Sequence, residues 1–254
     1  MPKTKTEVNE PESHTAQATR RVIFTMGGKG GVGKTGIVLA LADWFQANQI
    51  QVTLLDLDTE NKARGSLKHY FAQAQKVNIQ TPEGLDAFID CIDDGAQIVL
   101  ADMGAGSGQV THEWFDTMHE DLAETGVVFT AIGVVTPDPA SVESILSWAD
   151  RLQARVQYVI VENSITQPAD FHYFRNTEQA QRFRDVFHPA IIPAEHRLAK
   201  IENPARQHGV TLGQIAAKKT DLPEFRRTMP VARAQAYLRR LSGSFDSVKE
   251  FFLP

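Results

Sequence analysis

Short apolar runs alternate with longer stretches of mixed polar and apolar residues along most of the chain. The runs are rich in β-branched residues and predict buried strands, over residues 21–26, 51–58, 97–102, 126–135, 156–163 and 190–193. Several stretches between them carry apolar residues at helical spacing, over residues 35–49, 82–94, 111–124 and 138–154. Near-continuous apolar strands separated by helices are typical of a parallel sheet that is covered on both faces. The pattern therefore predicts an α/β fold with one doubly wound, mostly parallel sheet and helices on both of its faces.

The two ends of the chain depart from this alternation. Residues 1–20 are polar and lack the apolar segment of a signal peptide, so we expect a disordered arm there. Residues 21–254 contain no internal repeat and no obvious linker, and we expect a single domain with a helical C-terminal end. No apolar stretch of the sequence is long enough to span a bilayer, and Cys91 is the only cysteine. These features predict a cytoplasmic protein without an internal disulfide bond.

The C-terminal end is also basic, although the whole chain has a net charge of −5. Residues 197–240 contain ten lysines and arginines against three acidic residues, which gives this region a net charge of +7. A basic region on an acidic body indicates a polyanionic partner, but it is equally compatible with a solvated helical surface. Charge alone leaves both interpretations open.

A glycine-rich segment, MGGKGGVGKTG over residues 26–36, lies between the first predicted strand and the first predicted helix. Gly28, Gly33, Lys34 and Thr35 satisfy the pattern G-x-x-x-x-G-K-[ST]. In such a loop the backbone N–H groups wrap the phosphates of a nucleotide, and the helix N-terminus adds partial positive charge. The lysine reaches the β- and γ-phosphates, and the hydroxyl group of the threonine ligates Mg²⁺. The segment therefore predicts a nucleotide-binding site.

The same segment fits the dinucleotide fingerprint G-x-G-x-x-G, through Gly28, Gly30 and Gly33. Asp56 lies at the end of the second predicted strand, about where that fingerprint places an acidic residue. The Lys-Thr pair after the glycines decides between the two patterns, because a dinucleotide-binding helix has no use for an ammonium group and a metal-ligating hydroxyl in its first turn. The sequence therefore favours a nucleoside triphosphate.

The loop resembles the deviant Walker A motif of the ParA and MinD family of P-loop NTPases, K-G-G-x-G-K-[ST], which residues 29–35 match in full. The resemblance implies that the chain binds ATP and Mg²⁺, with the phosphates held by Gly28, Lys29, Gly30, Gly31, Val32, Gly33, Lys34, Thr35 and Gly36. It also implies a homodimer in which Lys29 reaches across the interface to the phosphates bound by the other subunit. An extra cation there stabilises the negative charge that develops during γ-phosphoryl transfer.

Three aspartates lie at the ends of two predicted buried strands, and the resemblance extends to them. It implies that Asp58 orients or activates the attacking water, and that Asp56 supports the Mg²⁺ shell or Lys34. Asp102 closes a buried strand, where a carboxylate is costly unless it serves a cation. The implied catalytic residues are Lys29, Lys34 and Asp58. The implied metal ligands are Thr35, Asp56 and Asp102, with the aspartates acting through water.

The base-binding end of the site is included in the resemblance. Asn163 lies just past a predicted strand and matches the family asparagine that hydrogen-bonds adenine. Pro193 and the neighbouring backbone are implied to line the same base. The chain departs from the family after the second predicted strand, where Thr59 and Glu60 stand in place of the usual Pro-Gln pair.

The resemblance implies a switch in which ATP binding favours the dimer, and slow hydrolysis, accelerated by an adaptor protein, releases it. The first hypothesis is that the dimer binds DNA without sequence preference and positions or segregates a plasmid or other cargo. The candidate DNA contacts are Lys218, Lys219, Arg226, Arg227, Arg239 and Arg240. The alternative is membrane association through the C-terminal segment FDSVKEFFLP, as in MinD. That segment is short, ends in proline and carries one lysine against two acidic residues, so the sequence favours DNA over a membrane.

Overall fold

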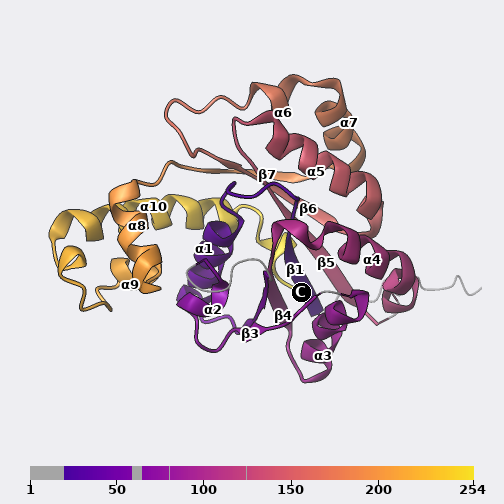
Figure 1. Ribbon diagram of the computed structural model, residues 1–254, viewed down its shortest axis with the longest axis horizontal. Coiled ribbons are helices and arrows are strands. Elements are labelled where there is room, and N and C mark those ends of the chain that lie inside the picture. Colours follow the sequence, from indigo (N-terminus) through magenta and orange to yellow (C-terminus); the bar gives the residue numbers. More distant parts are fainter. Residues whose placement is uncertain (1–19, 59–64, 80, 124) are drawn as a thin grey trace, which may run out of the picture.

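The computed structural model describes residues 20–58, 65–79, 81–123 and 125–254. The expected disordered arm lies outside the described residues, except for Arg20, which begins the first strand. Within the described residues, seven strands form one sheet with parallel neighbours throughout, in the order β3-β2-β4-β1-β5-β6-β7 (Figure 1). The strands are β1 (Arg20–Met26), β2 (Thr53–Leu57), β3 (Gln75–Lys76), β4 (Ile98–Met103), β5 (Val127–Val135), β6 (Gln157–Asn163) and β7 (Ala190–Ala194). This sheet confirms the predicted doubly wound α/β fold.

Helices cover both faces of the sheet (Figure 1). They are α1 (Lys34–Ala47), α2 (Leu67–Tyr70), α3 (Ala87–Asp93), α4 (Gly108–Ala123), α5 (Pro139–Leu152), α6 (His172–Asn176), α7 (Glu178–Phe187), α8 (Ala199–His208), α9 (Leu212–Ala216) and α10 (Thr228–Asp246). The apolar side chains of α3, α4, α5 and α7 form one core cluster with the sheet. Those of α1 and the second half of α10 form another on the opposite face.

The central strand β1 shows why both faces need helices. Residues 22–26 are buried, and the strand lies between β4 and β5. Phe24 packs against Phe88 and Phe115, from α3 and α4, whereas Ile23 joins the cluster that contains α1. Successive side chains of a strand point to opposite faces, so a strand that is apolar throughout must be covered on both.

The order of the strands determines where a ligand can bind. From β1 the chain runs through α1 to β2. In the strand order, β2, β3 and β4 lie to one side of β1, and β5, β6 and β7 lie to the other. In open parallel sheets, ligands bind outside the carboxyl ends of the strands at the point where the strand order reverses. This point is the loop between β1 and α1, next to the ends of β2 and β4.

The C-terminal part of the chain forms a helical lobe beside the sheet, which we define as residues 199–234 (Figure 1). The lobe contains α8, α9 and the first part of α10, and has its own apolar cluster of Ile201, Ala205, Ile215, Phe225, Val231 and Ala234. The rest of α10 packs on α1, where the ring of Phe245 lies edge-on to Trp44. The predicted helical C-terminal end is thus confirmed.

The residues after α10 pack against the sheet. Phe252 is fully buried and lies edge-on to two other buried aromatic rings. Arg21, at the start of β1, donates hydrogen bonds to the carbonyl oxygens of Glu250 and Leu253, each at 3.0 Å. The segment considered for membrane association is therefore docked, with Phe252 inside the core.

Candidate nucleotide-binding site

The glycine-rich loop connects β1 to α1 and closes at Gly33. This residue has a φ of 101°, in the left-handed region that favours glycine. A Cβ atom added at Gly33 would lie 2.5 Å from the Nδ2 atom of Asn163. Both the backbone angle and the close approach of β6 therefore require glycine at this position.

The N-terminus of α1 begins with Lys34, Thr35 and Gly36 and has no acidic residue in its first turn. The first N–H groups of a helix have no partner within the helix, and the helix dipole adds partial positive charge there. An anion such as a phosphate group is stabilised in this place. The loop and the helix N-terminus together have the charge and the free donors that a phosphate site needs, and their binding of phosphate stays a prediction.

The two lysines of the loop have different surroundings. Lys34 is buried, and its Nζ atom donates hydrogen bonds to the carbonyl oxygens of Gly27 and Lys29, each at 3.0 Å. The Nζ atom of Lys29 lies 3.1 Å from Oδ2 of Asp138, and both of these side chains are almost half exposed. Asp138 also caps α5 by accepting a hydrogen bond from the backbone N–H of Ala140. The ion pair of Lys29 is thus exposed to solvent, and exposed pairs of this kind are weak.

The aspartates predicted from the strand ends lie side by side. Asp56 of β2 is directly opposite Asp102 of β4 in the parallel register. Asp102 is 1% exposed, and neither of its carboxylate oxygens has a hydrogen-bond partner among the described residues. Burial raises the pKa of Asp102 to about 7, and the nearby hydroxyl of Thr35 opposes this rise.

The unpartnered carboxylate of Asp102 fits a divalent cation. A buried carboxylate is costly without a partner, and Mg²⁺ prefers oxygen ligands. Within the described ranges, no group of three or more histidine, cysteine, aspartate or glutamate side chains is arranged to hold a metal ion by itself. The cation would therefore depend on Thr35, Asp102, water and the phosphate oxygens of a nucleotide, as Mg²⁺ commonly does.

Asp56 and Asp58 differ in what they contact. The carboxylate of Asp56 is fully buried and accepts hydrogen bonds from the hydroxyl of Ser66 and from the backbone N–H groups of Lys68 and Asp58. These bonds hold the backbone on both sides of residues 59–64, so Asp56 has a structural role, and its predicted role in the Mg²⁺ shell stays a prediction. Asp58 is 6% exposed and lines a cavity next to the loop. Thr59 and Glu60 lie outside the described residues.

The predicted base-binding residues lie near the loop. Asn163 is 2% exposed, and its side-chain amide donates a hydrogen bond of 2.7 Å to the carbonyl oxygen of Val32. In this structure Asn163 therefore supports the loop. Pro193 is exposed on β7, where it pairs in register with Glu162. The roles of Asn163 and Pro193 toward adenine stay predictions.

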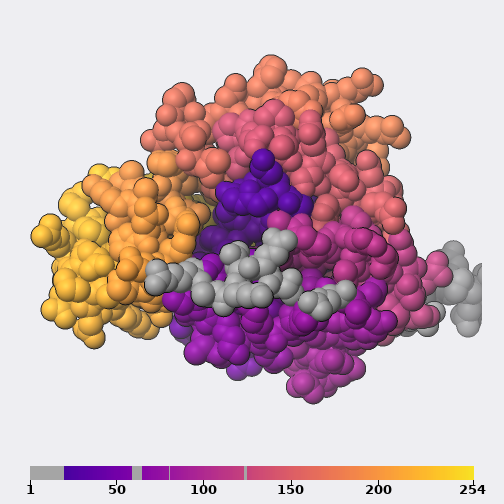
Figure 2. All heavy atoms as spheres, viewed as in Figure 1, coloured from indigo at the N-terminus to yellow at the C-terminus, as the bar shows by residue number. Residues whose placement is uncertain are grey.

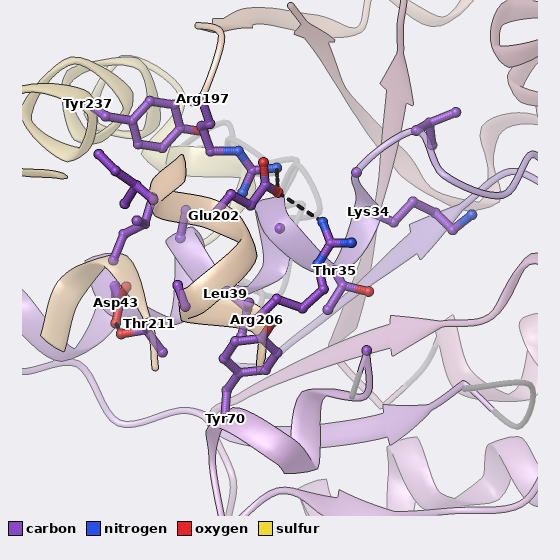
Figure 3. A pocket seen from close by; sticks show the side chains of 18 of the residues that line it. Lys34, Thr35, Leu39, Asp43, Tyr70, Arg197, Glu202, Arg206, Thr211 and Tyr237 are labelled. Atoms are coloured by element: carbon purple, nitrogen blue, oxygen red, sulfur yellow. Dashed lines mark hydrogen bonds and ion pairs between the residues drawn. The ribbon is translucent and has the colours of Figure 1, made fainter. Parts of the chain in front are cut away.

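A cavity of about 730 Å³ opens on the loop and extends toward the helical lobe. Figure 2 shows the surface hollowed between the loop and the lobe. Residues 30–36 form one wall, and residues of α1, α8, α10 and the connection between β7 and α8 form much of the rest, as seen from close by in Figure 3. Sequence reasoning did not assign Arg197 or Tyr237, two of the residues in these walls. The connection between β7 and α8 brings Arg197 to the loop, and the packing of α10 against α1 brings Tyr237 there.

Asp43 fastens α1 to the helical lobe. Its carboxylate accepts hydrogen bonds from the hydroxyl of Thr211 at 2.8 Å and from the backbone N–H of Gly213 at 2.7 Å. Burial raises the pKa of Asp43 from its ordinary 3.8 to about 6, although these two hydrogen bonds oppose the shift. The charged form of Asp43 is therefore less favourable in the folded protein than in the unfolded chain.

The pKa of Asp43 predicts a pH dependence of stability. Because its pKa is raised in the folded state, the native protein takes up this proton before the unfolded chain does. Asp43 therefore adds stability as the pH falls from about 7 to about 4, by up to about 3 kcal/mol. We expect Asp43→Asn to remove this component, so that the variant gains less than the wild type between about pH 8 and pH 5. Chemical denaturation at both pH values measures the difference, with the exposed Asp150→Asn as the control. Equal pH dependence in Asp43→Asn and the wild type would contradict the prediction.

The six candidate DNA contacts do not form one group. Lys218, Lys219, Arg226 and Arg227 are exposed at the end of the lobe, where α9 is joined to α10. Arg239 and Arg240 lie about 18 Å further along α10, at 1.5 Å per residue. Arg240 is paired at 2.6 Å with Glu195 and lines the cavity. The end of the lobe is therefore the better candidate for a surface that contacts a polyanion.

Comparisons with known proteins agree with this fold. Residues 23–206 match the family profile of the CobQ/CobB/MinD/ParA nucleotide binding domain. Protein MobD of Acidithiobacillus ferrooxidans is 20% identical over 158 residues, which are 61% of this chain and 70% of MobD. The MinD cell division protein of Aquifex aeolicus is 16% identical, and its structure matches with a TM-score of 0.51 over 88% of this chain and 98% of that one. The MinC:MinD cell division protein complex of Aquifex aeolicus gives 14% identity and a TM-score of 0.51, over 88% of this chain and 96% of that one. At such low identity, the structural likeness shows the fold alone.

Proposed function

Because the chain belongs to the CobQ/CobB/MinD/ParA family of nucleotide-binding domains, we propose that it is a Mg²⁺-dependent ATPase that dimerises with ATP and separates after hydrolysis. The ATP-bound dimer binds DNA without sequence preference and positions or segregates a plasmid or other cargo. One observation carries the ATPase proposal: Lys34 lies at the N-terminus of α1, with the unpartnered carboxylate of Asp102 close to Thr35.

The residues of the site divide the chemistry among them. The loop and the N-terminus of α1 bind the phosphates, and Lys34 neutralises the β- and γ-phosphates. Mg²⁺, held by Thr35 and by Asp102 through water, would supply further positive charge. Asp58, buried at the wall of the cavity, orients the attacking water.

The structure supports a role for Lys29 outside its own subunit. Its ammonium group lies on the surface of the loop, paired with Asp138, while Lys34 lies inside the loop. Exchanging an exposed ion pair for the phosphates of a partner subunit costs little. We propose that the dimer forms in this way and that an adaptor protein accelerates hydrolysis. The solved complex of MinC with MinD is a case of a relative that assembles with another protein.

The proposed DNA surface is tested by charge reversal. We expect Arg226→Glu combined with Arg227→Glu to weaken binding of the ATP-bound protein to DNA about 10- to 100-fold, because an arginine that no longer neutralises a phosphate no longer releases a counterion from the DNA. The measurement is the fluorescence anisotropy of labelled duplexes of unrelated sequence, with ATP and with ADP. Arg182→Glu combined with Lys249→Glu makes the same change in net charge at exposed positions outside the lobe. DNA affinity that responds neither to ATP nor to the reversal in the lobe would contradict the proposal.

The alternative is a membrane-associated positioning ATPase like MinD. Every helix of the described residues is too short or too polar to cross a membrane. The C-terminal segment FDSVKEFFLP offers little as a surface anchor, because Phe245 and Phe252 are buried in the core. Flotation with anionic liposomes in the presence of ATP tests this alternative, and wild-type protein that floats would favour the membrane.

A further inference from the structure

An arginine from the connection between β7 and α8 lies on the first turn of α1. A Cβ atom added at Gly36 would be 2.6 Å from both terminal nitrogens of Arg197. A Cβ atom added at Gly33 would be 3.8 Å from one of them. The guanidinium group therefore lies against the backbone of the loop and the helix N-terminus, and only a residue without a side chain at position 36 admits it.

The position of Arg197 is fixed by two other residues of the cavity wall. Its Nη2 atom lies 3.1 Å from a carboxylate oxygen of Glu202, and its guanidinium group lies 5.9 Å from the centre of the ring of Tyr237. The same oxygen of Glu202 is also 3.4 Å from Arg206, so one carboxylate serves two arginines (Figure 3). The side chain of Arg197 is 15% exposed. The pair of arginines thus keeps an excess of positive charge beside the loop.

We propose that Arg197 binds the phosphate chain of the nucleotide, at the end nearest to the nucleoside. This inference rests on the proposed function. A guanidinium group beside a helix N-terminus is a strong site for phosphate, because its planar donors form two parallel hydrogen bonds to phosphate oxygens. Lys34 and Thr35 serve the β- and γ-phosphates and the cation, while backbone N–H groups of the loop hold the α- and β-phosphates. Arg197 lies over Gly36, beyond these two residues, so its guanidinium group is placed to add side-chain hydrogen bonds to the α-phosphate beside those of the backbone.

This contact also connects the nucleotide to the helical lobe. Arg197 precedes α8, and Glu202 is in the first turn of α8. A phosphate that takes the guanidinium group competes with Glu202 for it. Binding of the nucleotide therefore changes an ion pair of the lobe that carries the proposed DNA contacts.

The test compares three ligands with Mg²⁺ present: ATP, ADP and inorganic tripolyphosphate. We expect Arg197→Ala to weaken all three about 10- to 100-fold in titration calorimetry, the range for hydrogen bonds to charged groups. Arg197→Lys should recover part of the loss, because it restores the charge without the paired donors. Gly36→Ala should also weaken binding, because its methyl group displaces the guanidinium group. Lys200→Ala is the matched control, since Lys200 is exposed on α8 and is not part of the cavity wall.

Each outcome decides the matter. Equal affinities of Arg197→Ala and the wild type for all three ligands would overturn the inference. A loss with ATP and ADP but none with tripolyphosphate would show contact with the nucleoside and overturn the phosphate contact. A wild-type protein that binds none of the three contradicts the proposed function itself, and the inference with it. Thermal unfolding without ligand identifies a variant that has lost its fold, and in that case Gly36→Ala and Arg197→Lys decide.

Discussion

Replacing Lys29 by alanine is expected to lower the rate of ATP hydrolysis by about a thousandfold and to leave the protein monomeric with ATP and Mg²⁺. A cation supplied by a partner subunit contributes about 10³–10⁵ to the rate of phosphoryl transfer in related chemistry. Asp58→Ala is expected to lower the rate about 10²- to 10⁴-fold, the usual contribution of general base catalysis. It should nevertheless preserve the dimer, because Asp58 acts on water and Lys29 on the phosphates of the partner. Single-turnover hydrolysis and light scattering after size exclusion measure both effects.

Asp138→Asn is the matched control for Lys29. Asparagine is as good a helix N-cap as aspartate, so α5 keeps its cap. The substitution removes only the charge that holds Lys29 within its own subunit. We expect the variant to hydrolyse ATP at least as fast as the wild type. Asp58→Ala that stays monomeric in saturating ATP and Mg²⁺ would count against a lysine shared between subunits.

The six predicted strands lie within about two residues of the observed ones, and the reason is physical. A strand buried on both faces is apolar over most of its length, so β1 and its neighbours can be recognised in the sequence. The phosphate loop could be predicted for a different reason: its working groups are consecutive residues, and their geometry comes from the local backbone. Asp56 and Asp102 could be placed together because parallel strands align their carboxyl ends.

The elements that the sequence did not predict carry little apolar signal. β3 consists of Gln75 and Lys76, both exposed, and adds only a short edge to the sheet. The helix α7 buries just Ala180 and Phe183 among polar residues, so its apolar face is narrow. Local pattern does not distinguish such segments from loops.

The walls of the cavity could not be predicted because they come from distant parts of the chain. Arg197 follows β7, and it contacts the first turn of α1 because β7 is the edge strand of the sheet and the chain after it runs back to the loop. Asn163 shows the same limit, since its donation to Val32 depends on the approach of β6 to the loop. The family motif identified Asn163, but it did not determine which contact Asn163 makes.

Arg21 is the residue whose loss should most lower stability outside the apolar core. It is 5% exposed, and burial lowers the pKa of its guanidinium group. Besides the two carbonyl oxygens of the C-terminal segment, it donates to the hydroxyl of Thr130 at 3.1 Å and to the side-chain oxygen of Gln157 at 2.6 Å. One side chain thus joins β1, β5, β6 and the end of the chain.

We expect Arg21→Ala to lower the free energy of unfolding by about 3 kcal/mol, because it leaves several polar groups without their donor. For a domain of this size the melting temperature should fall by about 10 °C. The C-terminal segment should also detach, which would expose Phe252 and increase binding of a hydrophobic dye. Arg20→Ala, the neighbouring residue on the same strand, is the control and should change the free energy of unfolding by less than about 0.5 kcal/mol. Calorimetry and denaturant unfolding without nucleotide measure both variants. Equal free energies of unfolding for Arg21→Ala and Arg20→Ala would contradict the prediction that the hydrogen bonds of Arg21 hold the C-terminal segment on the sheet.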